Sequence, residues 1–196
     1  MGSSNKRSIR HQYEDLGVDR FYTSHGGDYV NPHEDQLRIG LKRSLTTWLV
    51  NKSIPTLPET VMDLACGSGE VTRVLQGHPL LSQACTIFGV DPYTSASYQA
   101  KTSCTCFEYT FEQLATEQPE HLKAALIICS YALHLVDTSY LHGLLQYFAS
   151  SIGAQHLIVV TPHKNPQINE SMGWELVQEL RHPECRQRYR LYRKRQ

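Results

Sequence analysis

The sequence predicts a doubly wound α/β fold, in which helices cover both faces of a mostly parallel, seven-stranded sheet. From residue 60 onward, short apolar runs alternate with helical patterns, as expected of parallel strands joined by helical crossovers. The last two strand-like runs, at 174–180 and 188–192, are too close for a helical crossover and should pair antiparallel. The 196 residues suit one domain, which we expect at 13–196.

The residues before the first strand are expected to form a tail and a helical segment. Residues 1–12 are polar and basic, which predicts disorder. Within 13–55, Asn31 suits a helix cap, Pro32 the first helical position and Glu34 a capping box. Apolar residues then recur at spacings of three and four, which predicts an amphipathic helix packed on the core: Leu37, Leu41, Leu45, Trp48 and Leu49.

Five strand-like runs precede the terminal pair, and each is short and largely apolar: 60–65, 86–90, 104–107, 124–129 and 156–161. The run at 124–129 is apolar throughout, as in a strand that is covered on both faces. The first helix between strands should end at Gln76, because Gly77 is a helix stop. Helical turns are also expected at 111–117, and a longer helix around Leu141–Phe148.

The stretch Asp63–Gly69 reads Asp-Leu-Ala-Cys-Gly-Ser-Gly and joins the first strand to the first helix after it. A strand that stops at such a turn leaves backbone N–H groups at the edge of the sheet. Glycine at 67 and 69 lets a ligand approach the main chain, since no Cβ intervenes. A dinucleotide fingerprint would need a third glycine where Thr72 stands.

This stretch resembles the motif D/E-x-G-x-G-x-G of class I S-adenosylmethionine-dependent methyltransferases, with Ala65 in place of the first glycine. The terminal antiparallel pair also matches the seven-stranded fold of that family. The resemblance covers residues 60 to 196. It implies transfer of the methyl group of S-adenosylmethionine to an O, N or S nucleophile, most often of a small molecule, which leaves S-adenosylhomocysteine. The cofactor-binding residues that it implies are Asp63, Ala65, Cys66, Gly67, Gly69, Asp91, Pro92, Tyr93, Thr110, Phe111 and Ser130.

Within this set, Asp91 follows the second strand, about 20 residues beyond Gly69, where dinucleotide folds place a carboxylate on the ribose hydroxyls. A strand-end Asp that prepares the turn at Pro92 is the alternative. Thr110 and Phe111 follow the third strand, in the turn that frames the adenine in the family. Phe111 has the alternative of simple core packing.

The catalytic candidates are Tyr131, His134 and His163, which follow the fourth and fifth strands. Residues 128–135 resemble the corresponding segment of many small-molecule and tRNA-wobble methyltransferases. His134 could serve as a general base, because the ordinary histidine pKa lies near neutrality, or it could be a structural histidine that opens a helix. His163 and Lys164 could contact an anionic or hydroxyl-bearing substrate, or lie in a solvated loop.

An N-terminal lid over the cofactor is common in the family. Gly26 and Gly27 could give such a lid its mobility. Its substrate contacts would come from aromatic and imidazole side chains that an aromatic packing patch explains equally well: Tyr22, His25, Tyr29 and His33.

Charge and cysteine content restrict the partners. Lys+Arg and Asp+Glu both number 19, so the net charge does not favour nucleic acid or a membrane surface. A basic strand at Arg186, Arg188 and Arg190 leaves RNA methylation or RNA binding as an alternative function, although such residues also protect a sheet edge. A cofactor-binding protein without catalysis is a further alternative.

The six cysteines include no C-x-x-C pair, which favours buried thiols over a zinc site or a disulfide framework, so no metal is expected. No apolar run approaches the length of a membrane span. A soluble protein of the cytoplasm is therefore expected.

Overall fold

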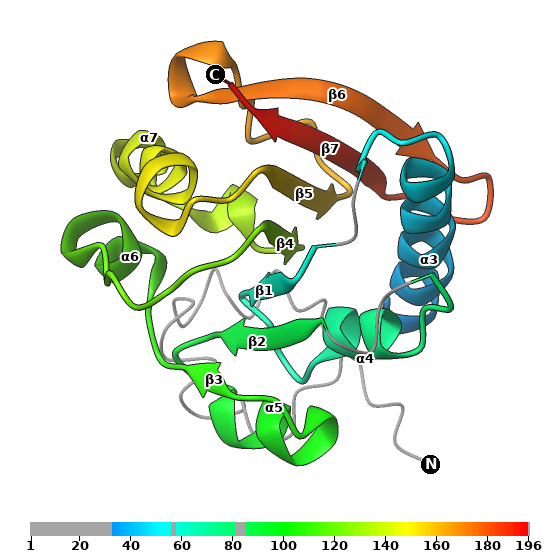
Figure 1. The fold of residues 1–196 in the computed structure, drawn as a ribbon, viewed down its shortest axis with the longest axis horizontal. Helices are drawn as coiled ribbons and strands as arrows, with labels where there is room; N and C mark the ends of the chain where they lie inside the picture. Colours follow the sequence, from blue (N-terminus) through cyan, green and yellow to red (C-terminus); the bar gives the residue numbers. More distant parts are fainter. Residues whose placement is uncertain (1–32, 56–57, 81–84, 196) are drawn as a thin grey trace, which may run out of the picture.

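The structure is a computed structural model that describes residues 33–55, 58–80 and 85–195. Its sheet has seven strands in the order β3-β2-β1-β4-β5-β7-β6 (Figure 1). The strands are β1 Thr60–Leu64, β2 Thr86–Val90, β3 Cys106–Phe107, β4 Leu126–Ser130, β5 His156–Thr161, β6 Trp174–Arg181 and β7 Arg188–Lys194. The predicted fold class is confirmed: β1 to β5 run parallel, and β7 lies antiparallel between β5 and β6.

Helices lie on both faces of the sheet. They are α3 Glu34–Val50, α4 Glu70–Gln76, α5 Ser95–Thr102, α6 Phe111–Glu117 and α7 Thr138–Tyr147. Helices α6 and α7 cover one face and α3 and α4 the other, while α5 lies beside β3 (Figure 1). Each face of the sheet has its own hydrophobic core, and alternate residues of β1 point into one or the other. Met62 packs with α6 and α7, and Val61 packs with α3 and α4. The described residues also form three short helical turns, at Leu133–Leu135, Phe148–Ile152 and Glu170–Met172.

Helix α3 packs closely on the terminal strand. The predicted apolar stripe is buried except for Leu49, which is half-buried. Gly40 faces the ring of Tyr189, whose hydroxyl oxygen would lie 2.0 Å from a Cβ at that position. Its start differs from the prediction. His33 is the N-cap and makes no side-chain capping bond, and Glu34 forms an ion pair with Arg73 instead of a capping box. The predicted cap and first position, Asn31 and Pro32, lie outside the described residues.

Two strands begin two residues later than expected. Strand β3 has only two residues, Cys106–Phe107, so Cys104 precedes it. Strand β4 begins at Leu126 and not at residue 124. Among the helices of the described residues, none is both long and apolar enough to cross a membrane.

Candidate functional site

The loop between β1 and α4 lies at the carboxyl edge of the parallel strands. Three of its residues have a left-handed backbone: Ala65 with φ +54°, Gly67 with φ +53° and Gly69 with φ +92°. Such a conformation disfavours a side chain, so Ala65 is strained where the family motif has glycine. The loop is held from below by hydrogen bonds from Ala65 N–H to the Val90 carbonyl and from Gly69 N–H to the Cys66 carbonyl, at 2.7 and 2.9 Å.

Asp63 fixes the start of α4 from inside the protein. It is fully buried, and its Oδ2 accepts hydrogen bonds from Thr72 N–H at 3.1 Å and Thr72 Oγ1 at 2.7 Å. The hydroxyl groups of Thr72 and Tyr98 lie 2.8 Å apart and extend this network to α5. Burial raises the pKa of Asp63 well above its ordinary value, and the bonds from Thr72 oppose that shift. The sequence indicated only that Thr72 stands where a dinucleotide fingerprint has glycine. In the structure, Thr72 is the hydrogen-bond donor to the motif aspartate.

Asp91 links the loop to the segment that follows β2. Its Oδ1 accepts from the N–H groups of Tyr93 and Thr94 at 2.9 and 3.1 Å, and its Oδ2 accepts from Gly67 N–H at 3.2 Å. A carboxylate oxygen can accept two hydrogen bonds, so Oδ2 has a second acceptor position. Burial raises the pKa of Asp91, while these backbone N–H groups lower it.

Glycine and cysteine residues allow close packing beside the loop. A Cβ on Gly89 would lie 2.7 Å from the sulfur of Cys66, and one on Gly69 would lie 2.3 Å from the Thr102 methyl carbon. The Cys66 and Cys106 sulfurs are 3.6 Å apart, and all six cysteines are free thiols. Burial raises the pKa of Cys66, which disfavours its thiolate. No group of three or more potential metal ligands occurs among the described residues.

The turn after β3 is organised by a helix cap. Thr110 Oγ1 accepts from Gln113 N–H at 3.1 Å, and Gln113 Oε1 accepts from Thr110 N–H at 2.9 Å. The side chain of Thr110 therefore forms the capping box of α6. Phe111 packs against the core, which agrees with the alternative considered for it. His121 lies 5.4 Å from the Phe107 ring centroid and 6.0 Å from that of Tyr109, an aromatic group that sequence reasoning missed.

Two of the three catalytic candidates, His134 and His163, lie together at the carboxyl ends of β4 and β5. The ring centroids of His134 and His163 are 4.7 Å apart. His134 Nδ1 is buried, and no hydrogen-bond partner for it occurs among the described residues. Burial and the neighbouring His163 lower the pKa of His134 below the ordinary value of 6.5, so it is neutral at pH 7. A neutral imidazole in such a position can accept a proton.

Tyr131, the third candidate, contacts the residue that precedes helix α3. It follows β4 with a left-handed φ of +57°, and its ring stacks on His33 with centroids 5.7 Å apart. One of the four predicted lid residues is therefore beside a catalytic candidate. The other three, Tyr22, His25 and Tyr29, lie outside the described residues, as do Gly26 and Gly27.

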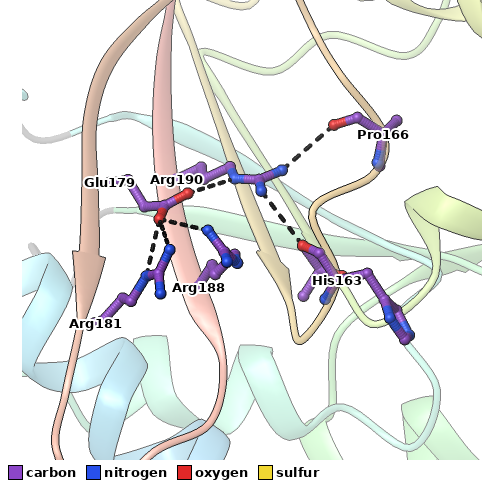
Figure 2. A network of polar contacts seen from close by, with 7 residues as sticks. His163, Pro166, Glu179, Arg181, Arg188 and Arg190 are labelled. Carbon is purple, nitrogen blue, oxygen red and sulfur yellow. Dashed lines mark hydrogen bonds and ion pairs between the residues drawn. The ribbon is translucent and has the colours of Figure 1, made fainter.

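Two of the three arginines of the predicted basic face, Arg188 and Arg190, are paired with an acidic residue of the neighbouring strand. Glu179 of β6 accepts hydrogen bonds from Arg181, Arg188 and Arg190 (Figure 2). Arg190 is buried, with 6% of its surface exposed. Sequence periodicity found the shared face of Arg188 and Arg190, but the acidic partner on the neighbouring strand was missed. These two arginines are engaged within the protein, whereas Arg186, the third residue of the predicted face, is exposed.

A family model described as a methyltransferase domain matches residues 39–195. An uncharacterised protein of Schizosaccharomyces pombe is 30% identical over an alignment 200 residues long. The alignment covers 86% of this chain and 80% of that protein. The magnesium protoporphyrin IX methyltransferase of Synechocystis, solved with bound S-adenosylmethionine, has a TM-score of 0.57 at 18% identity and 95% coverage of both chains. The N-methyltransferase NodS of Bradyrhizobium japonicum, solved with S-adenosylhomocysteine, has a TM-score of 0.60 at 13% identity, covering 95% of this chain and 98% of its own.

Proposed function

Because the chain belongs to the family of methyltransferase domains, we propose that it transfers the methyl group of S-adenosylmethionine to an O, N or S nucleophile of a small molecule. The observation that carries this proposal is the hydrogen bond from Gly67 N–H of the motif loop to Asp91 Oδ2, an oxygen that can accept a second hydrogen bond. Similar folds hold this cofactor or its product in the Synechocystis and Bradyrhizobium enzymes. Bound here, it would supply an electrophilic methyl group on a positively charged sulfur.

The residues of this chain fit that ligand in three ways. Left-handed glycines at 67 and 69 keep the loop free of side chains where the methionine portion would lie. Asp91 Oδ2 would accept a hydrogen bond from a ribose hydroxyl. Asp63 does not need to touch the ligand, since it holds the loop through Thr72. The remaining cofactor contacts that we propose are those of Ala65, Cys66, Pro92, Tyr93, Thr110, Phe111 and Ser130.

The acceptor would lie beside His134, His163 and Tyr131, at the carboxyl ends of β4 and β5. His134, neutral at pH 7, would accept the proton that a hydroxyl, thiol or amine loses on methylation. The enzyme would align this nucleophile with the methyl group and exclude water. Small-molecule acceptors are favoured because two of the three arginines on which an RNA acceptor depended, Arg188 and Arg190, are paired with Glu179. The Synechocystis relative is likewise named for a porphyrin.

Calorimetry with S-adenosylhomocysteine tests the cofactor half of the proposal, and we expect binding. Labelled S-adenosylmethionine incubated with fractionated cell extract tests the acceptor half, and we expect label in the small-molecule fraction. Label in RNA, together with RNA binding that weakens steeply with salt, would replace the small molecule by RNA. Cofactor binding without any transfer would leave a non-catalytic binding protein, and absence of binding would overturn the proposal.

Replacing His134 by alanine is expected to slow methyl transfer by about 100-fold, because a general base is removed. The affinity for S-adenosylhomocysteine should remain unchanged. In the unchanged protein, the rate should rise with pH through the lowered pKa of His134 and be level at pH 7, since only the neutral imidazole accepts a proton. The control is His142→Ala, which removes an exposed histidine of α7. Equal rates for the two variants would exclude His134 as the base.

A further inference from the structure

We propose that Glu179 and Arg190 are positioning residues of the acceptor site, which hold the loop after β5 and so keep His163 beside His134. This inference rests on the proposed function, because it assigns the two histidines to the acceptor side. The loop, residues 162–167, leaves the sheet at the carboxyl end of β5 and contains His163 and Pro166. Neither Glu179 nor Arg190 reaches the site itself; both belong to the terminal strand pair.

Arg190 binds the loop through two backbone carbonyls. Its Nη2 donates to the His163 oxygen and its Nη1 to the Pro166 oxygen, each at 3.3 Å (Figure 2). Its Nε donates to Glu179 Oε2 at 2.9 Å. All three nitrogen atoms of the guanidinium group thus donate a hydrogen bond at once. Its planar, extended shape permits this arrangement, and the compact ammonium of lysine cannot reach the same three acceptors. With 7% of its side chain exposed, Arg190 has little water to replace these partners.

The loop has few other anchors on its own side. Pro162, His163, Lys164 and Asn165 are all exposed, and Pro162 and Pro166 offer no N–H groups for hydrogen bonds. The His163 N–H donates to Thr161 Oγ1 at 3.1 Å, which fixes only the beginning of the loop. Together with the buried side chain of Pro166, the two bonds from Arg190 therefore hold the segment from His163 to Pro166 near the sheet.

Glu179 sets the orientation of Arg190. It lies directly opposite Arg190 in the β6–β7 register, while Arg181 lies opposite Arg188. Two like charges that face each other across strands repel, but Glu179 Oε1 accepts from both of these arginines, at 3.0 and 2.9 Å. Although burial opposes ionisation, bonds from Arg190 and Arg181 give Glu179 a pKa below its ordinary value. The carboxylate of Glu179 thus accepts hydrogen bonds from three arginines, and the buried one, Arg190, donates to the loop.

The effect on the acceptor site follows from the position of His163. Its ring lies 4.7 Å from that of His134 and is one of two causes that lower the pKa of the latter. A loop that moved away would leave His134 more exposed to water and farther from His163. Methyl transfer would then lose a base of fixed position while cofactor binding remained, since Asp91 and the motif loop lie elsewhere on the sheet edge.

The variant Arg190→Lys tests the inference, because it keeps the charge and removes the fork. Its matched control is Arg193→Lys on the same strand, whose residue pairs with the opposite Glu175 at an exposed position and has no bond to the loop. Trypsin should cut after Lys164 about tenfold faster in Arg190→Lys, and in the control at the original rate. The NMR signals of the His134 ring should shift in Arg190→Lys alone, and Glu179→Gln should give the same two changes.

In Arg190→Lys, transfer of labelled methyl groups to the small-molecule fraction should fall about tenfold, while S-adenosylhomocysteine binds as before. Equal cleavage at Lys164 and unchanged His134 signals in Arg190→Lys and Arg193→Lys would overturn the inference. Cleavage and NMR need no substrate, so they decide on the loop even if the unchanged protein binds no S-adenosylhomocysteine and the proposed function fails. A loosened loop with undiminished transfer would likewise exclude a positioning role.

Discussion

Replacing Gly69 by alanine is expected to lower the free energy of unfolding by about 3 kcal/mol and to weaken S-adenosylhomocysteine binding roughly tenfold or more. Two costs add at this position. The left-handed φ of +92° disfavours any L side chain, and the new Cβ would lie 2.3 Å from the methyl carbon of Thr102 on α5. Either the loop or α5 must move, and both frame the proposed cofactor site. Urea denaturation and calorimetry measure the two effects.

Two further variants separate these costs. Gly153 has a similar φ of +81°, but no atom lies within 4 Å of the position that a Cβ would take there, so Gly153→Ala should show the backbone cost of about 1 kcal/mol alone. Thr102→Ser removes the clashing methyl carbon while it keeps the hydroxyl that donates to the Tyr98 carbonyl. In that background, Gly69→Ala should lose only slightly more stability than Gly153→Ala, because Tyr98 Cδ2 would still lie 3.3 Å from the new Cβ. If Gly69→Ala costs no more than Gly153→Ala in the original background, the close approach of loop and α5 is wrong.

The elements that the sequence predicted accurately are those whose signals are local. The bounds of β2 and β5, Thr86–Val90 and His156–Thr161, agree with the expectation because apolar β-branched runs end there at Asp91-Pro92 and Pro162. Helix α4 ends at Gln76 before Gly77, as expected. The antiparallel terminal pair followed from the shortness of its connection, which no helix can fill.

Some features had a local signal that was not used. Thr110 and Gln113 form the pattern T-x-x-Q, which is typical of a capping box at the start of α6. Helix α5 had a weaker signal, because its two fully buried residues, Tyr98 and Thr102, include a polar one. Periodicity of apolar residues alone does not find such a helix.

The contacts that act at long range had no local signal. Arg190 reads as a solvent-exposed charge, and its burial depends on Glu179 and on two carbonyls 24 and 27 residues away in the chain. The pairing of His134 with His163 depends in turn on neighbouring β4 and β5. Strand order brings these residues together, and the sequence predicted only that they share an edge of the sheet.

Replacing Asp91 by asparagine is expected to weaken S-adenosylhomocysteine binding by about 100-fold, which corresponds to about 2.7 kcal/mol. Three backbone N–H groups donate to the carboxylate, and an amide offers one acceptor oxygen in its place. Its NH₂ group would face at least one N–H group, donor against donor. The acceptor position proposed for the ribose is lost at the same time. Calorimetry on the folded variant measures the change.

A pH titration gives a second measure of the same carboxylate. Burial raises the pKa of Asp91 above the ordinary value of 3.8. Because the ionised form accepts the bonds, binding should be complete above this raised pKa and weaken as the pH falls through it. In Asp91→Asn this dependence should be absent. Coincident binding curves for the two proteins across that pH range would show that another group is responsible.

The control for Asp91→Asn is Asp137→Asn, since Asp137 also accepts a backbone hydrogen bond, from Ser139 N–H at 2.8 Å, but caps α7 at an exposed position. Asparagine caps a helix about as well as aspartate, so Asp137→Asn should change the free energy of unfolding by less than about 0.5 kcal/mol and leave cofactor affinity unchanged. A comparable loss of affinity in both variants would mean that Asp91 acts through general stability. Loss in Asp91→Asn alone, with its pH dependence gone, requires a carboxylate at the ligand.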